Sequence, residues 1–231
     1  MSTQILGQNA QSQYIIWIDN EVLENQSADA QQWCLEHSAS MVGQIDGIDA
    51  VWQNRLPVWM QLQPCQDWAA YFGFQCSFTD PDGKDLFWKT GAALETQSQA
   101  CQDWIAANNV FLMPVSKFNP VNPDYPEATP AMDGFWRQGL TIYDQDEGTQ
   151  TRFNNVLSIP CDELYTRERK LKPDGTAYGE HVWRYTNRVF IYKTLGLSIN
   201  IDFAYAHEFG APNMFDDFTE TITLTEIEIT E

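Results

Sequence analysis

Two acidic segments carry the residues whose type and spacing could bind a hard cation. Asp80 and Asp82 lie in the segment DPDGKD, and Asp144 and Asp146 lie in DQDEGT. Alternate carboxylates beside a glycine are typical of loops that hold calcium through oxygen ligands. Neither segment ends in the glutamate that closes a twelve-residue calcium loop, so ordinary acidic turns are the alternative interpretation. We therefore expect no cofactor, and calcium at these two turns is a hypothesis to test.

Motifs for catalysis are sparse in this sequence. It contains no G-x-S-x-G elbow, no phosphate-binding Walker loop and no G-x-G-x-x-G fingerprint. The segment Ala206–Phe218 brings His207 and Glu208 together with Asp216 and Asp217 between two expected strands. Loops on a rigid sheet often carry function, so a carboxylate-dependent hydrolase stays open as a second alternative. The sequence on balance favours a protein that is not an enzyme.

Tryptophans recur at a fixed interval along the first half of the chain. Three pairs are separated by sixteen residues, namely Trp17 and Trp33, Trp52 and Trp68, and Trp88 and Trp104. The segments QPCQDWAAYFG and QACQDWIAANN repeat the same residues around two of the second tryptophans. This periodicity predicts three copies of a unit of about 36 residues.

Each unit is predicted to contain a strand, a helix and a second strand. Short apolar runs such as Tyr14–Ile18 carry the first tryptophan and are typical of strands. Ser27 and Ser98 are suited to cap helices at their N-termini, and Pro64 is suited to a first helical turn. The segments IDGID and DPDGKD carry Asp-Gly turn residues that favour hairpins between units.

The C-terminal part has a different pattern. Alternating apolar residues between Val189 and Tyr205, with a break near Gly196, predict two strands with one buried face. KPDGT predicts a hairpin turn, and Leu140–Asp144, Phe153–Ile159 and the final TETITLTEIEITE are expected to be further strands. The fold class is therefore α+β: three strand-helix-strand repeats followed by an antiparallel β-sandwich or barrel.

Three regions follow from these patterns. Residues 1–116 form the tryptophan-containing repeats, and residues 135–231 form the mostly antiparallel β domain. Residues 117–134 form a proline-rich connector, because proline cannot continue a helix or a central strand.

Charge limits the partners of this chain. Its formal net charge is −19, with 32 acidic and 13 basic residues, which disfavours nucleic acid and anionic membranes. The hairpin segment YTRERKLK nevertheless gathers four basic residues, Arg167, Arg169, Lys170 and Lys172. Such charges either protect an exposed edge strand or contact the acidic surface of a neighbouring copy.

The start of the sequence and its cysteines bear on localisation. No signal peptide and no apolar run long enough to span a membrane are evident, so we expect cytoplasmic synthesis without membrane insertion. The five cysteines include no Cys-x-x-Cys pair and are expected to be free thiols.

These observations favour a structural or assembly subunit of a larger particle, such as a phage virion or tail component. Copies of itself or other subunits would be its partners. The alternative is a carbohydrate-binding or host-recognition module, in which Trp17, Trp52 and Trp88 would stack on sugar rings. The competing interpretation of these tryptophans is that they fill the space between helix and sheet.

Overall fold

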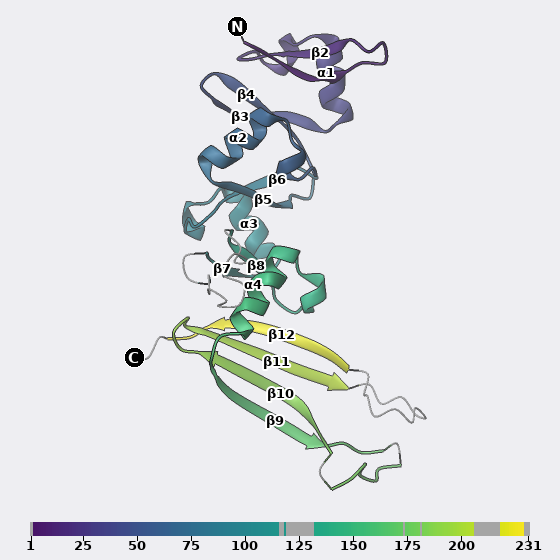
Figure 1. The fold of residues 1–231 in the computed structure, drawn as a ribbon, viewed down its shortest axis with the longest axis vertical. Coiled ribbons are helices and arrows are strands. Elements are labelled where there is room, and N and C mark those ends of the chain that lie inside the picture. Colours follow the sequence, from purple (N-terminus) through teal and green to yellow (C-terminus); the bar gives the residue numbers. More distant parts are fainter. Residues whose placement is uncertain are drawn as a thin grey trace. The chain divides into compact units, whose positions relative to one another are not determined.

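The computed structural model describes residues 2–115, 118, 132–172, 174–180, 182–205 and 218–228. The fold is mixed, with four α-helices and twelve strands in antiparallel pairs among the described residues (Figure 1). The class expected from the sequence is confirmed at this level. Contacts divide the chain into a first unit, Met1–Trp104, and a second unit, Ile105–Glu231. Most of the expected connector, residues 117–134, lies outside the described residues.

In the first unit a β-hairpin, a short 3-10 turn and an α-helix follow one another repeatedly, and we call this succession a module. The hairpins are β1 (Thr3–Gln8) with β2 (Tyr14–Ile18), β3 (Ala39–Ile45) with β4 (Ile48–Gln53), and β5 (Phe74–Thr79) with β6 (Asp85–Lys89). The helices that follow them are α1 (Ala28–Glu36), α2 (Gln63–Phe72) and α3 (Gln99–Ala107), the last of which ends in the second unit. β1 was not predicted, because its polar residues give no apolar run.

The helix starts follow from the residues that the sequence places there. The hydroxyl oxygen of Ser27 accepts a hydrogen bond from the backbone N–H of Ala30 at 3.2 Å, and that of Ser98 accepts one from Cys101 at 3.3 Å. Each satisfies a donor that the first helical turn leaves without a partner. Pro64 lies in the first turn of α2. All three predictions of helix starts are confirmed.

A buried glutamine closes the loop between each hairpin and its helix. The side-chain amide of Gln26 accepts from the N–H of Ile18 at 2.9 Å and donates to its C=O at 2.7 Å. It thereby pairs with that residue as a neighbouring strand would. Gln61, Gln97 and Gln145 make the same two bonds to the residue eight positions earlier. Each lies at most 7% exposed, so these amides replace backbone pairing in an irregular segment.

Gln145 belongs to a fourth module, in the second unit, that was not recognised in the sequence. It consists of β7 (Val110–Met113), β8 (Gly134–Arg137), a 3-10 turn (Ile142–Asp144) and α4 (Glu147–Leu157). The prediction of strands at Leu140–Asp144 and Phe153–Ile159 was therefore wrong. Asp146 accepts a hydrogen bond from the N–H of Thr149 at 2.9 Å and so starts a helix in this segment.

Arg152 replaces the second tryptophan in the fourth module. It lies sixteen residues after Trp136 and is 1% exposed. Its guanidinium donates hydrogen bonds to the carbonyl oxygens of Phe118 and Met132. Burial lowers the pKa of Arg152, and the nearby charge of Asp133 opposes this shift. This change from an indole to a charged group explains why tryptophan spacing detected only three modules.

A four-stranded antiparallel sheet completes the second unit. Its strands are β9 (Asp162–Arg169), β10 (Trp183–Tyr192), β11 (Leu197–Tyr205) and β12 (Phe218–Glu226), in the order β12-β11-β10-β9. The break near Gly196 and the C-terminal strand are as predicted. In the described part of this unit the four strands form one sheet. The other sheet described in this unit is the two-stranded sheet of β7 (Val110–Met113) and β8 (Gly134–Arg137), so the predicted sandwich or barrel is not confirmed.

One end of this sheet shares a core with the fourth module. Leu197, Ile199 and Ile201 alternate along β11 and are buried together with Trp136 and Phe153. The side chain of Gln138 accepts from the N–H of Leu224 at 3.0 Å and donates to its C=O at 2.6 Å. The other end of the sheet, where β9 pairs with the start of β10, remains exposed.

Candidate functional surfaces

The first tryptophan of each module lies in the core. Trp17, Trp52 and Trp88 are 1%, 0% and 1% exposed, so their ring faces are not accessible to a sugar in this structure. The indole N–H of Trp17 donates to Asp49 at 2.8 Å, and that of Trp52 donates to Asp85 at 2.9 Å. Each acceptor belongs to the hairpin of the following module. Trp17 and Trp52 therefore link their modules to the next one, and the burial of all three rings favours the core interpretation.

The second tryptophans pack against a position on the first strand of the hairpin. A Cβ atom built on Gly43 would lie 2.2 Å from the indole nitrogen of Trp68, and one on Gly7 would lie 3.1 Å from that of Trp33. Glycine is required at Gly43 because the ring occupies the space of a side chain. In the third module Phe78 follows the bulge in β5 and stacks on Trp104, with ring centroids 3.9 Å apart.

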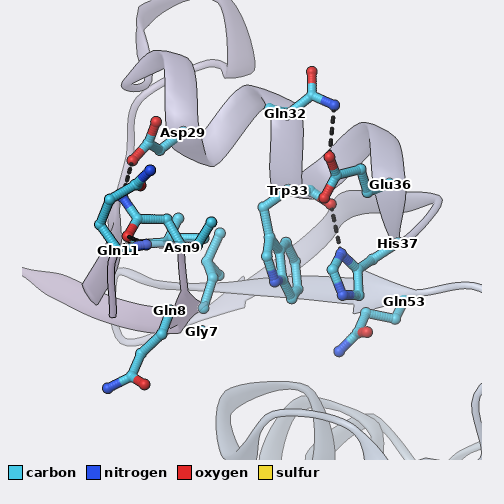
Figure 2. Close-up of a pocket in the computed structure, with 13 residues that line it drawn as sticks. Gly7, Gln8, Asn9, Gln11, Asp29, Gln32, Trp33, Glu36, His37 and Gln53 are labelled. Carbon is cyan, nitrogen blue, oxygen red and sulfur yellow. Dashed lines mark hydrogen bonds between the residues drawn. The ribbon is translucent and has the colours of Figure 1, made fainter. Parts of the chain in front are cut away.

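A groove of about 610 Å³ lies beside Trp33 in the first module. Figure 2 shows Asn9 and Asp29 on one side of it and Trp33 and His37 on the other. Asn9 donates to the Asp29 carboxylate at 2.8 Å. The His37 ring stacks on Trp33 with centroids 4.4 Å apart, and its Nδ1 lies 2.9 Å from the Trp33 carbonyl oxygen.

Amides and carboxylates dominate the polar lining of this groove, including Gln8, Gln11, Gln32, Glu36 and Gln53. Gln32 donates to Glu36 at 2.7 Å, so this carboxylate already has one partner. Amides supply both donors and acceptors, which suits a ligand with several hydroxyl groups. Trp33 is only 6% exposed, so stacking of a ring on its face is not available.

The candidate calcium turns have structural uses. Asp80 accepts from the backbone N–H of Lys84 at 2.8 Å and closes a hairpin turn that Asp82 shares. Asp144 accepts from the hydroxyl of Thr141 at 2.8 Å, and Asp146 caps α4. No group of three or more His, Cys, Asp or Glu side chains is arranged to hold a metal ion among the residues that the structure describes. Calcium binding stays a hypothesis.

An exposed strip of arginine and aromatic side chains lies on one face of the sheet at its open end. Arg167 and Arg169 of β9 lie opposite Tyr185 and Trp183 of β10, and Tyr165 lies two residues before Arg167 on the same face. We call these five residues the arginine–aromatic strip. The Arg167 guanidinium lies 5.1 Å from the Trp183 ring centroid, and the rings of Tyr165 and Tyr185 meet edge-on at 5.3 Å. The aromatic members are 40–51% exposed.

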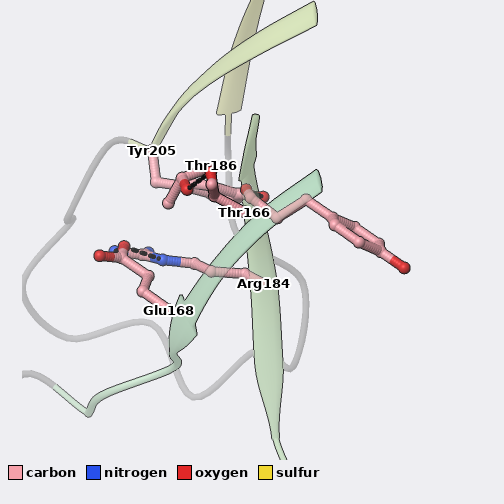
Figure 3. Close-up of polar contacts among 6 residues, drawn as sticks. Thr166, Glu168, Arg184, Thr186 and Tyr205 are labelled. Atoms are coloured by element: carbon pink, nitrogen blue, oxygen red, sulfur yellow. Dashed lines mark hydrogen bonds and ion pairs between the residues drawn. The ribbon is translucent and has the colours of Figure 1, made fainter. Parts of the chain in front are cut away.

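The opposite face of the same strands is polar and internally paired (Figure 3). Arg184 forms an ion pair with Glu168 at 2.6 Å, and its guanidinium lies 4.3 Å from the Tyr205 ring centroid. The hydroxyls of Thr166 and Thr186 are 2.8 Å apart. The charges on this face thus have partners within the chain.

The four basic residues predicted as a partner contact are divided by the structure. Arg167 and Arg169 lie in the exposed strip, and within the described part of the chain neither has a carboxylate partner. Lys170 is 5% exposed, with its ammonium nitrogen 5.1 Å from the Tyr178 ring centroid. Lys172 is exposed at the KPDGT turn, where its N–H donates to Thr176 at 2.7 Å. The strip aromatics were missed, because a single strand does not show which residues of the next strand lie beside it.

His181, His207, Glu208, Asp216 and Asp217 lie outside the described residues. Cys34, Cys65 and Cys101 are buried free thiols, and burial raises the pKa of Cys34 to about 11 and that of Cys65 to about 12. Among the described helices, none has the length and apolar character needed to cross a membrane.

The chain matches no protein-family model, and searches of curated proteins and of solved structures find no similar chain.

Proposed function

We propose that this chain is a non-enzymatic structural subunit that associates with copies of itself through its four-stranded sheet. The observation that carries this proposal is the state of β9. This strand pairs only with β10 in the described sheet, and all eight of its residues are exposed. An open edge strand offers unpaired backbone donors and acceptors to another chain. A larger particle, such as a phage virion or tail, is the setting in which we place the subunit.

Charge supports a partner that carries carboxylates. Arg167 and Arg169 project from an exposed edge on a chain with a formal net charge of −19. Another copy carries 32 acidic and 13 basic residues, so most of the charged groups that it can place beside these arginines are carboxylates. Charged residues can also protect an edge strand from pairing. The exposed Tyr165, Trp183 and Tyr185 beside them favour contact, because interfaces are enriched in aromatic residues and arginine.

Light scattering of the purified full chain tests the proposal. We expect a defined oligomer of the 26.5 kDa chain, shifted toward monomer in the double variant Arg167→Ala and Arg169→Ala. The double variant Lys84→Ala and Lys89→Ala is the control, because it removes the same charge from exposed positions in the first unit. A monomer at all concentrations, with and without calcium, would rule out self-association.

We further propose that the four modules are copies of one sequence repeat. The spacing of the first tryptophan, the loop glutamine and the following helical glutamine supports this. Trp136, Gln145 and Gln150 reproduce the intervals of Trp17, Gln26 and Gln31. Gln31 and Gln150 each donate to the backbone carbonyl of the loop glutamine, at 2.9 and 2.8 Å.

A carbohydrate-binding role is the second candidate, and the groove beside Trp33 is the observation that favours it. Its amide and carboxylate groups can bond to sugar hydroxyls without the buried tryptophans. A glycan array compares the wild-type chain with Asp29→Asn and Glu36→Gln. Loss of a specific glycan signal in both variants would support this role, and an array without signal would exclude it for the glycans present.

A further inference from the structure

We propose that β9 pairs antiparallel with β9 of a second copy. The two strands are related by a two-fold axis that passes midway between Thr166 of one copy and Thr166 of the other. This inference rests on the proposed function, and it names the partner surface and its register. The two sheets of four strands would then join into one sheet of eight strands. The arginine–aromatic strips of the two copies would lie on the same face and meet at the axis.

Geometry restricts the registers that such a pair can adopt. Residues directly opposite each other in an antiparallel pair point to the same face of the sheet. A two-fold axis perpendicular to the sheet keeps each face of one copy on the same side as that face of the other. Successive residues of a strand alternate between faces, so residues that lie opposite each other must be an even number of positions apart in the sequence. One residue of β9 therefore lies opposite the same residue of the second copy, and the axis passes at that position.

Charge selects one of the remaining registers. With Thr166 on the axis, Glu163 lies opposite Arg169 of the second copy, and Tyr165 lies opposite Arg167 of the second copy. Both contacts occur twice by symmetry, and both are favourable cross-strand pairs. Leu164 then lies opposite Glu168 of the second copy, so no two like charges within β9 are directly opposed.

The other registers are less complementary. With Tyr165 on the axis, Glu163 would face Arg167 of the second copy, but Asp162 would also face Glu168 twice, and these like charges repel. With Arg167 on the axis, this arginine faces itself and only five residues of each β9 overlap. In registers centred on Leu164 or Glu168 the two β9 strands overlap by no more residues than in the register centred on Arg167. Neither of these registers forms a pair of opposite charges.

Ion pairs within the chain are compatible with the Thr166 register. The β9 carboxylates Asp162 and Glu163 lie 2.6 Å from Lys193 and 2.8 Å from Arg188. Arg167 and Arg169 have no such partner in the described residues. Pairing would place each Glu163 carboxylate between Arg188 of its own chain and Arg169 of the second copy. The arginine charges that are uncompensated in one copy would thereby gain a carboxylate or an aromatic ring.

Cysteine cross-linking of the full chain reads the register directly. In the proposed pair only position 166 lies opposite itself, with Cα atoms about 4.5–5.5 Å apart, within the range that a disulfide spans. Cysteines at 165 or at 167 would be offset by two residues and about 8 Å apart, which is too far. Thr166→Cys is therefore expected to form covalent dimer about ten-fold faster than Tyr165→Cys or Arg167→Cys. The wild-type chain is the control, because it shows how fast covalent dimer forms through the native cysteines alone.

The outcomes separate this inference from the proposed function. Fastest cross-linking at position 166 supports the register, and fastest cross-linking at 165 or 167 overturns it. A dimer in light scattering that none of the three cysteines cross-links overturns β9 as the interface while the assembly function stands. A chain that is monomeric in light scattering overturns both.

A charge exchange tests the central ion pair independently. Glu163→Arg alone would oppose arginine to arginine, and Arg169→Glu alone would oppose glutamate to glutamate. Each variant is expected to raise the dimer dissociation constant about ten-fold. An equimolar mixture of the two variants restores two complementary pairs in a heterodimer, which supports the pairing. Folding of each variant is checked by circular dichroism, and a mixture of folded variants that forms no heterodimer overturns the Glu163–Arg169 contact.

Discussion

Asp49 is the position at which the link between modules can be tested most directly. Its carboxylate is 0% exposed and accepts hydrogen bonds from the Trp17 indole at 2.8 Å, the Asn20 N–H at 3.1 Å and the Gln44 amide at 2.6 Å. Asp49→Ala removes the acceptor of all three donors. We expect it to destabilise the first unit strongly, because the Trp17 N–H stays buried without a partner.

The expected magnitude follows from the donors left behind. A buried donor without a partner costs about 1–3 kcal/mol, so losing the acceptor of the Trp17 indole, with a smaller contribution from the part-buried Asn20 N–H, lowers the free energy of unfolding by about 2–4 kcal/mol. Asp49→Asn keeps one oxygen for Trp17 and Asn20, and the Gln44 amide can turn to accept from the new NH₂ group. It should therefore cost only about 1–2 kcal/mol, the part of the stabilisation that depends on the negative charge.

Urea unfolding followed by far-ultraviolet circular dichroism measures these values. In a Trp17→Phe background the cost of Asp49→Ala should fall by about 1–2 kcal/mol, because the orphaned indole is gone. Asp67→Ala, at an exposed position of α2, is the control and should stay within about 0.5 kcal/mol of wild type. An Asp49→Ala variant as stable as this control, or additive effects at positions 17 and 49, would refute the reasoning.

Three further predictions concern packing, thiol ionisation and helix capping. Gly43→Ala should lower the free energy of unfolding by about 1–3 kcal/mol, since its Cβ would meet the Trp68 ring, and Gly7→Ala should cost less; equal losses in urea melts would contradict this. Burial raises the pKa of Cys65 from 9.0 to about 12, so the unfolded thiol ionises first and stability should fall as pH rises above 9. Thermal melts at pH 8 and pH 10.5 should show a smaller fall for Cys65→Ala, and an unchanged fall would argue against this cause. Asp146→Ala should cost about 1 kcal/mol through loss of the cap on α4. A rise in melting temperature with calcium, lost in this variant, would instead show a cation site.

Local signals in the sequence were sufficient for most elements of the first unit. Ser27, Ser98 and Pro64 act within one helical turn, and an Asp-Gly turn needs only the conformations of its own residues. Gly47, for example, has φ of 78°, which glycine adopts without strain. Such features depend on neighbours in the chain and are therefore readable from it.

The fourth module was missed because its most visible marker is absent. Arg152 stands where the other modules have tryptophan, so the interval of sixteen residues between two tryptophans does not occur there. The prediction of a strand at Phe153–Ile159 is wrong because a short apolar run does not distinguish a strand from a buried helix. Asp146 is suited to cap a helix, but its spacing from Asp144 beside a glycine is also typical of a calcium turn, so the sequence does not decide between the two.

The sequence by itself determined the order of hairpins and helices in the first unit, the turn positions and the alternating strands of the sheet. These are set by backbone conformation and side-chain periodicity over a few residues. Only the tertiary structure decided that Trp17 is fastened to Asp49, that Lys170 is covered and that Arg167 lies beside Trp183. Burial and cross-strand register bring together residues far apart in the chain, and one sequence carries no direct record of those distances.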